Sequence, residues 1–154
     1  MSLFATRIDT PIGALVALVD ENGALASLLF PHQPVPAGVA WDDARGAAAA
    51  AQLAEYFRGE RTRFELALAP RGTDFQRAVW AELQRIPYGA TISYRALAER
   101  LGRPNASRAV GRANATNPLP IVVPCHRVIG ANGSPTGYAG GIEAKTMLLG
   151  LERA

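Results

Sequence analysis

The chain has 154 residues, which is enough for one ordinary domain or two compact ones. Its composition, 49% hydrophobic and 19% charged, is typical of a globular protein and excludes a largely disordered chain. The apolar stretches fall short of the roughly 20 residues that cross a bilayer, and the start lacks a secretory pattern, so we expect no membrane segment and no export. The single cysteine excludes an internal disulfide and a cysteine-type zinc site, and a cytoplasmic location fits it best.

The net charge of +3 is unevenly distributed. Residues 1–70 hold five arginines against eight acidic residues, whereas residues 71–154 hold eleven basic residues against five acidic ones. Such a basic half indicates contact with a polyanion, of which nucleic acid is the usual one, although many basic faces are only solvated. We therefore expect any nucleic-acid contact in the second half.

The first half predicts a small α/β domain with an antiparallel β-sheet. Two apolar runs within Gly13–Phe30 flank Asn22-Gly23, a strong hairpin signal, so a β-hairpin is expected there. Residues 31–38 hold three prolines and predict a loop, in which His32 is exposed.

A helix and a third strand are expected next. Asp42 or Asp43 would cap an alanine-rich helix that ends just before Gly59. The alternating residues 63–69 predict a strand, and residues 69–72 a linker to the second domain.

The second half predicts a mostly helical domain. Thr73 and Gln76 form a capping box for a helix that ends before a turn at residues 86–90. Ser93 would cap a second helix through Leu101.

A third helix would be capped by Asn105 and span residues 106–114, and together with the second it has the dimensions of a helix-turn-helix. Arg108 and Arg112 lie four residues apart on one face, where like charges cost a few tenths of a kcal/mol in an isolated helix. A phosphate partner would offset that cost. A solvated basic face is the simpler interpretation of these residues alone.

The stretch "IVVPCHRVIG" contains the only cysteine, Cys125, followed directly by His126. The β-branched run 121–123 predicts a buried strand that Pro124 ends, so the cysteine would lie where a core strand emerges into a loop. A thiol becomes nucleophilic when an imidazole takes its proton or a cation such as Arg127 stabilises the thiolate. Adjacency does not prove contact, because neighbouring side chains of a strand point to opposite faces, and a lone cysteine is often an inert core residue.

Three stretches together carry a resemblance to a known family. "NP" at residues 117–118, "PCHRVIG" and "GYAGG" at residues 137–141 resemble the signature of the O6-alkylguanine-DNA alkyltransferases, or methylated-DNA-protein-cysteine methyltransferases. The match extends over the whole second half. It implies an α+β fold: a small N-terminal α/β domain, residues 1–70, with a structural role, then a mostly helical domain, residues 71–154, that contains a winged helix-turn-helix, binds DNA and carries out transfer.

The implied activity is repair of double-stranded DNA by transfer of the alkyl group from O6 of a flipped-out guanine to Cys125. The thioether product has no easy reversal, so each molecule would act once. His126 would take the thiol proton through a water, and Glu152 would orient His126. Tyr94 would donate a proton toward the leaving guanine and lie near the DNA backbone. Without the resemblance, Glu152 reads as a solvated glutamate in the last turn of a helix from about Ile142.

The resemblance implies further contacts. Arg108 would enter the base stack in place of the extruded nucleotide, and Asn117 would be a hinge between the recognition helix and the active-site loop. The DNA-binding helix would approach the minor groove with Arg112, Gly111, Ala113 and Ala115. The substrate pocket and hinge would also include Arg127, Val128, Tyr138, Ala139 and Gly140.

No cofactor and no metal are expected, because the first half offers only His32 as a zinc ligand of the kind that some members use. The expected partner is double-stranded DNA carrying O6-alkylguanine, bound by a monomer. Cooperative binding on DNA, the range of alkyl groups, activity on O4-alkylthymine and a DNA contact by the first half stay open.

Two other classes share part of this pattern. Alkyltransferase-like proteins bind alkylated DNA without transfer, but they lack the acceptor cysteine, which is present here. A winged-helix transcription regulator would share the helix-turn-helix and the basic half, but it would not require the Pro-Cys-His-Arg sequence.

Overall fold

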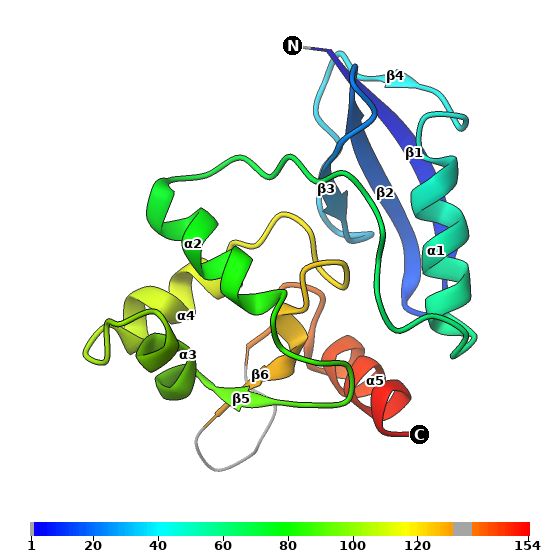
Figure 1. Cartoon of the computed structure of the whole chain (residues 1–154). Coiled ribbons are helices and arrows are strands. Elements are labelled where there is room, and N and C mark those ends of the chain that lie inside the picture. The colour runs from blue at the N-terminus through cyan, green and yellow to red at the C-terminus, as the bar shows by residue number, and fades with distance from the viewer. Residues whose placement is uncertain (1, 131–136) are drawn as a thin grey trace. The chain divides into compact units, whose positions relative to one another are not determined.

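The computed structural model describes residues 2–130 and 137–154. Contacts within the chain divide it into two compact units, Met1–Arg71 and Gly72–Ala154. Among the described residues, the first unit combines a sheet with one helix, and the second contains four α-helices and two short strands (Figure 1). The α+β prediction is confirmed. Within the described residues, no helix is both long and apolar enough to cross a membrane.

The first unit contains a four-stranded sheet of order β3-β2-β1-β4. The strands are β1 Leu3–Thr10, β2 Gly13–Asp20, β3 Leu25–Leu29 and β4 Ala40–Trp41. Strand β2 pairs antiparallel with β1 and β3, and the short β4 pairs in parallel with β1. The sequence predicted the β2-β3 hairpin but not β1 or β4. In β1 the polar Thr6 is buried because its hydroxyl donates to the carbonyl of Asp42 at 2.8 Å, which disturbs the alternation that marks a strand.

The hairpin turn depends on Asp20, Asn22 and Gly23. The Asp20 carboxylate accepts from the backbone N–H groups of Asn22 and Ala24, both at 2.9 Å. Gly23 has a φ of 84°, a left-handed conformation that glycine adopts without steric cost. The local sequence therefore specifies this turn.

Helix α1, Ala47–Phe57, packs against β1 and begins later than predicted. Its N-cap is Gly46, while Asp42 instead accepts from the N–H of Ala44 in a preceding turn, so the predicted aspartate cap is wrong. Gly59 follows its end with a φ of 75°, as expected.

The predicted strand over residues 63–69 is also wrong. Only an isolated bridge forms, between Leu68 and Leu25. Upstream, the side chain of Gln52 on α1 exchanges two hydrogen bonds with the backbone of Glu65, at 2.9 and 3.1 Å. That amide satisfies peptide groups that a neighbouring strand would otherwise bind.

In the second unit, the predicted first two helices are confirmed, with local caps. Thr73 and Gln76 form the expected capping box of α2, and Ser93 accepts from the N–H of Ala96 at the start of α3. The elements are α2 Asp74–Leu83, β5 Ile92–Ser93, α3 Tyr94–Arg100, α4 Ser107–Ala115, the 3-10 turn η1 Cys125–Arg127, β6 Val128–Ile129 and α5 Ile142–Arg153. Strands β5 and β6 pair in parallel.

Helices α3 and α4 pack together and form the predicted helix-turn-helix, whereas the wing stays a prediction. Asn105 is not the cap of α4: its N-cap is Ala106, and no side chain caps it. The predicted strand at residues 121–123 is absent as well, because this run folds into tight turns.

Candidate active site

Cys125 follows a buried loop built from two three-residue turns. Every residue from 119 to 128 is buried. The N–H of Val122 donates to the carbonyl of Pro120 at 2.8 Å across Ile121, whose φ is 73°, and the N–H of Cys125 donates to the carbonyl of Val123 at 2.8 Å across Pro124. These are γ-turns, and a positive φ is strained for a β-branched residue. Local turns, rather than a strand end, therefore place the cysteine.

Asn117 ties this loop together. Its Nδ2 donates to the carbonyl of Val123 at 2.8 Å, and its Oδ1 accepts from the N–H of Leu119 at 3.0 Å. The Asn117 amide also lowers the pKa of the Cys125 thiol. One residue just past the end of α4 thus holds the loop that carries the cysteine.

The thiol of Cys125 is poorly ionised in the resting protein. Burial raises its pKa to about 11, although the Asn117 hydrogen bond and the charge of Lys145 act in the opposite direction. At pH 7, four units lower, only about one thiol in 10⁴ is a thiolate. Efficient attack therefore requires a base that takes the proton.

His126 has the chemical features of such a base. The chain turns at Pro124 into η1, and His126 is fully buried with its Nε2 2.7 Å from Oε2 of Glu152. Because a carboxylate only accepts, Nε2 carries the proton and Nδ1 is left as a basic nitrogen, which has no hydrogen-bond partner among the described residues. Burial, the largest cause, lowers the pKa of His126, so the imidazole is neutral at pH 7.

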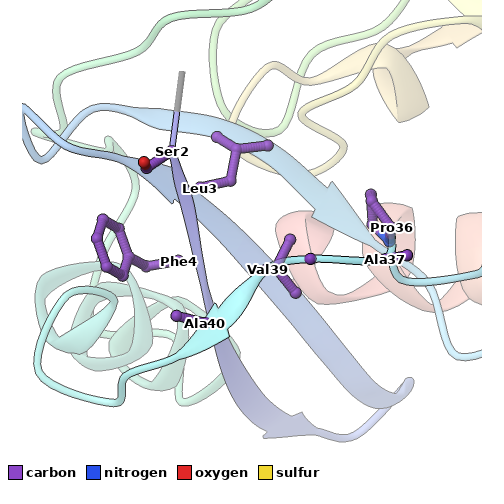
Figure 2. Close-up of a pocket in the computed structure, with 8 residues that line it drawn as sticks. Ser2, Leu3, Phe4, Pro36, Ala37, Val39 and Ala40 are labelled. Carbon is purple, nitrogen blue, oxygen red and sulfur yellow. The ribbon is translucent and has the colours of Figure 1, made fainter.

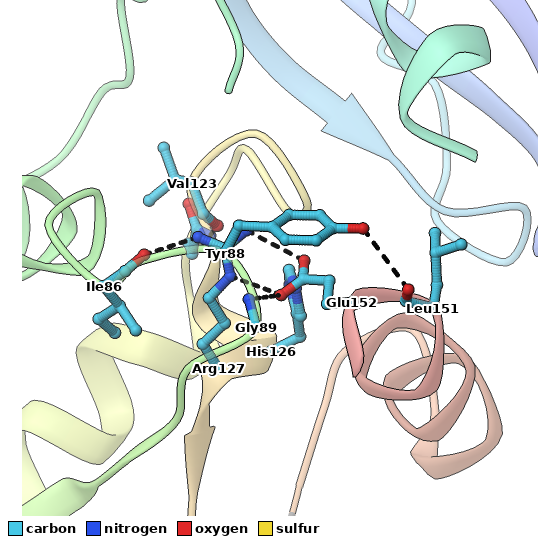
Figure 3. A network of polar contacts seen from close by, with 9 residues as sticks. Ile86, Tyr88, Gly89, Val123, His126, Arg127, Leu151 and Glu152 are labelled. Carbon is cyan, nitrogen blue, oxygen red and sulfur yellow. Dashed lines mark hydrogen bonds and ion pairs between the residues drawn. The ribbon is translucent and has the colours of Figure 1, made fainter. Parts of the chain in front are cut away.

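Arg127 binds both oxygens of the same carboxylate (Figure 3). Its Nε and Nη2 donate to Oε1 and Oε2 of Glu152 at 2.8 and 3.0 Å, and its Nη1 donates to the carbonyl of Ile86 at 2.7 Å. Gly89 N–H adds a weaker bond to Oε1 at 3.4 Å. Glu152 is thus buried and accepts several hydrogen bonds, so it is not a solvated glutamate. Arg127 pairs with this carboxylate, whereas the sequence suggested that Arg127 would stabilise the Cys125 thiolate.

The cation that acts on the thiol is Lys145, which the sequence analysis missed. Its side chain is fully buried, and its Nζ donates to the carbonyl of Val128 at 2.6 Å. Its charge lowers the pKa of Cys125, while burial lowers the pKa of Lys145 itself. A lysine within an amphipathic helix is normally solvated, so no sequence signal identified it.

A hollow of about 450 Å³ lies between α3, α4 and residues 137–139. Its lining brings together six of the predicted residues: Tyr94, Arg108, Gly111, Ala115, Tyr138 and Ala139. A methyl group added at Gly111 would lie 3.8 Å from the ring of Tyr94, so α4 is thin at this point. Cys125, Asn117, Val128 and Gly140 are not among its described lining residues.

Helix α4 presents a basic, low-profile face. Arg108, Arg112 and Ala115 are exposed. Ala113, however, is 3% exposed, and its carbonyl accepts from the indole of Trp80 at 2.8 Å, so the prediction that it faces DNA is wrong. Its neighbour Asn114, which the sequence analysis overlooked, lines the hollow and donates from Nδ2 to the carbonyl of Cys125 at 3.4 Å.

The first unit has a separate hollow of about 330 Å³, bounded by Ser2–Phe4 and residues 36–40 (Figure 2). None of its described lining residues is titratable. His32 is exposed, as predicted, and stacks on Phe30. Across the described ranges, no group of three His, Cys, Asp or Glu residues is arranged to hold a metal ion.

Comparisons with known proteins agree on one family. The family model for the DNA-binding domain of 6-O-methylguanine DNA methyltransferase matches residues 74–154. A methylated-DNA-protein-cysteine methyltransferase of Mycolicibacterium paratuberculosis is 50% identical over 95% of this chain and 90% of its own. One from Methanosarcina acetivorans is 45% identical over 97% and 98% of the two chains. The structure of Mycobacterium tuberculosis OGT in complex with DNA is similar with a TM-score of 0.93 and 47% identity, covering 97% of this chain and 92% of that one.

Proposed function

Because the chain belongs to the 6-O-methylguanine DNA methyltransferase family, we propose that it repairs DNA by accepting an alkyl group from O6 of guanine onto Cys125. The observation that carries the proposal is the grouping of the buried Cys125, His126 and Glu152 beside the partly buried Asn117. His126 follows the thiol directly in the chain, keeps a basic Nδ1 without a partner among the described residues, and is bonded through Nε2 to the Glu152 carboxylate.

The proton moves first. His126 accepts the thiol proton at Nδ1, through a water as the resemblance implies, and becomes an imidazolium that the Glu152 carboxylate stabilises at 2.7 Å. Lys145 and the Asn117 amide stabilise the thiolate. His126 thus removes the proton, and Lys145 and Asn117 stabilise the anion that remains. A thiol this deeply buried therefore reacts only when its base is correctly aligned.

The alkyl group moves next. The sulfur lone pair attacks the alkyl carbon, the carbon–sulfur bond forms, and the bond from carbon to O6 breaks with its electrons staying on guanine. Tyr94, on the wall of the hollow, supplies a proton toward the departing base. The thioether has no leaving group that would restore the thiol, so the protein acts once.

The reaction requires the nucleotide outside the helix, because O6 takes part in base pairing. We propose that the hollow beside α4 receives the extruded base and that exposed Arg108 fills the space it leaves. Arg112 would bind phosphate, which makes affinity salt-dependent. The acidic first unit would have a structural role, and the protein would bind DNA as a monomer.

Intact-protein mass spectrometry after incubation with a duplex that contains O6-methylguanine tests the proposal. We expect a gain of one methyl group that is absent in Cys125→Ala, while that variant still binds the duplex. An unchanged mass of the wild-type protein would refute the proposal.

A further inference from the structure

Asn114 carries a polar atom that no interaction within the protein explains. Its residue is 4% exposed, and Oδ1 has no hydrogen-bond partner in the part of the chain that the structure describes. A buried acceptor without a donor is costly, so such an atom needs an explanation.

The orientation of the amide is fixed. The carbonyl of Cys125 can only accept, and it lies 3.4 Å from Nδ2 of Asn114. The NH₂ group must therefore face the cysteine backbone, which leaves Oδ1 as the outward acceptor. Asn114 also lines the hollow beside α4, so it connects this hollow to the nucleophile's backbone.

We propose that Asn114 Oδ1 reads the extruded base by accepting a hydrogen bond from the exocyclic N2 amine of O6-alkylguanine; this inference rests on the proposed function. Alkylation at O6 removes the proton from N1, so the N2 amine is the only N–H donor that the base retains. O4-alkylthymine has no such donor. The same oxygen would thus favour guanine over thymine as the substrate.

Burial supports this role over a solvent-facing one. Asn114 lines the hollow, but its Oδ1 is inaccessible to solvent, so water does not supply the missing bond. A base that fills the hollow would reach Oδ1 after small rotamer changes of lining side chains, which are common on binding. The gain from satisfying this acceptor is then specific to bases that carry an amine.

The test compares single-turnover methyl transfer from two duplexes, one with O6-methylguanine and one with O6-methylhypoxanthine, which lacks the N2 amine. For the wild-type protein we expect the guanine lesion to react faster by a factor on the order of 10. Asn114→Leu removes the acceptor and should bring the ratio of the two rates to about 2 or less. Asn114→Asp keeps an oxygen acceptor and should keep the ratio, although both rates fall because the donor to Cys125 is lost.

Asn105→Leu is the matched control, since Asn105 is exposed and outside the lining of the hollow; its ratio should equal that of the wild type. An Asn114→Leu protein that slows both substrates equally would show a purely structural role and overturn the inference. Should that variant not fold, loss of the ratio in Asn114→Asp, or equal wild-type rates on both lesions, would overturn it too. Absence of methylation of the wild-type protein by O6-methylguanine would instead refute the proposed function, and the inference with it.

Discussion

Glu152 combines two roles that a double substitution can separate. Its side chain is 1% exposed and accepts from the buried Arg127 at 2.8 and 3.0 Å, and it orients His126 at 2.7 Å. Glu152→Gln leaves the guanidinium buried without a counter-charge, which costs about 3–5 kcal/mol. In a unit of this size, each kcal/mol of lost stability lowers the melting temperature by about 4–8 °C. The melting temperature of Glu152→Gln should therefore fall by more than roughly 10 °C.

Replacing both charges should restore much of that stability. In Glu152→Gln/Arg127→Met neither ion is left unpaired, and we expect the double variant to melt above either single variant. Methyl transfer should not recover, because a neutral amide at position 152 stabilises the His126 imidazolium poorly. The amide can also donate to Nε2 of the neutral ring, and the ring proton of His126 would then sit on Nδ1, where it blocks the base. The single-turnover rate should stay about 10²–10⁴-fold below that of the wild type.

Calorimetry and intact-mass kinetics would measure the two effects, at a temperature where circular dichroism finds every variant folded. A double variant that regains both stability and a rate within about threefold of the wild type would refute the reasoning, because Glu152 would then serve only to balance Arg127.

Four further outcomes are expected. The pH profile of transfer should be level around neutrality and fall only below pH 6.5, because burial lowers the pKa of His126 and the neutral ring is the base; an acid midpoint above 6.5 would contradict this. Lys145→Met should raise the thiol pKa above about 11 and slow iodoacetamide alkylation about tenfold at fixed pH, whereas Lys145→Arg should slow it less. Arg108→Ala should slow transfer more on duplex than on single-stranded substrate, measured side by side, since only the duplex needs its gap filled. The methylated protein should melt several degrees lower by calorimetry, because Cys125 is 5% exposed and an added methyl overpacks its site by about 1–3 kcal/mol; equal melting temperatures would argue against strain.

Features specified by neighbouring residues could be predicted from the sequence. The Thr73 capping box, the Ser93 cap and the turn at Gly23 each depend on groups within four residues of one another. The family resemblance likewise singled out Cys125, His126 and Glu152 as candidates, and the structure brings the side chains of His126 and Glu152 together. The sequence could not predict which distant residue each side chain would contact in the folded protein.

The errors have a common physical origin in long-range contacts. Residues 121–123 have strand propensity, but the bond from Asn117 to Val123 and the surrounding prolines hold them in turns. Lys145 is buried because a carbonyl of β6 accepts from it, and this pairing spans 17 positions. Periodicity records which face of an element is apolar, and it does not record which polar group will meet a distant partner.

The γ-turn at Ile121 has a consequence for the entropy of the reaction. Flanking prolines restrict the loop even in the unfolded chain, and the Asn117 bonds remove most of its remaining freedom on folding. The sulfur is therefore confined before DNA arrives, and its ordering adds little to the activation barrier of a protein that reacts only once. A nucleophile that is used a single time depends on reaching its alignment at the first encounter, and this strained loop provides that alignment in advance.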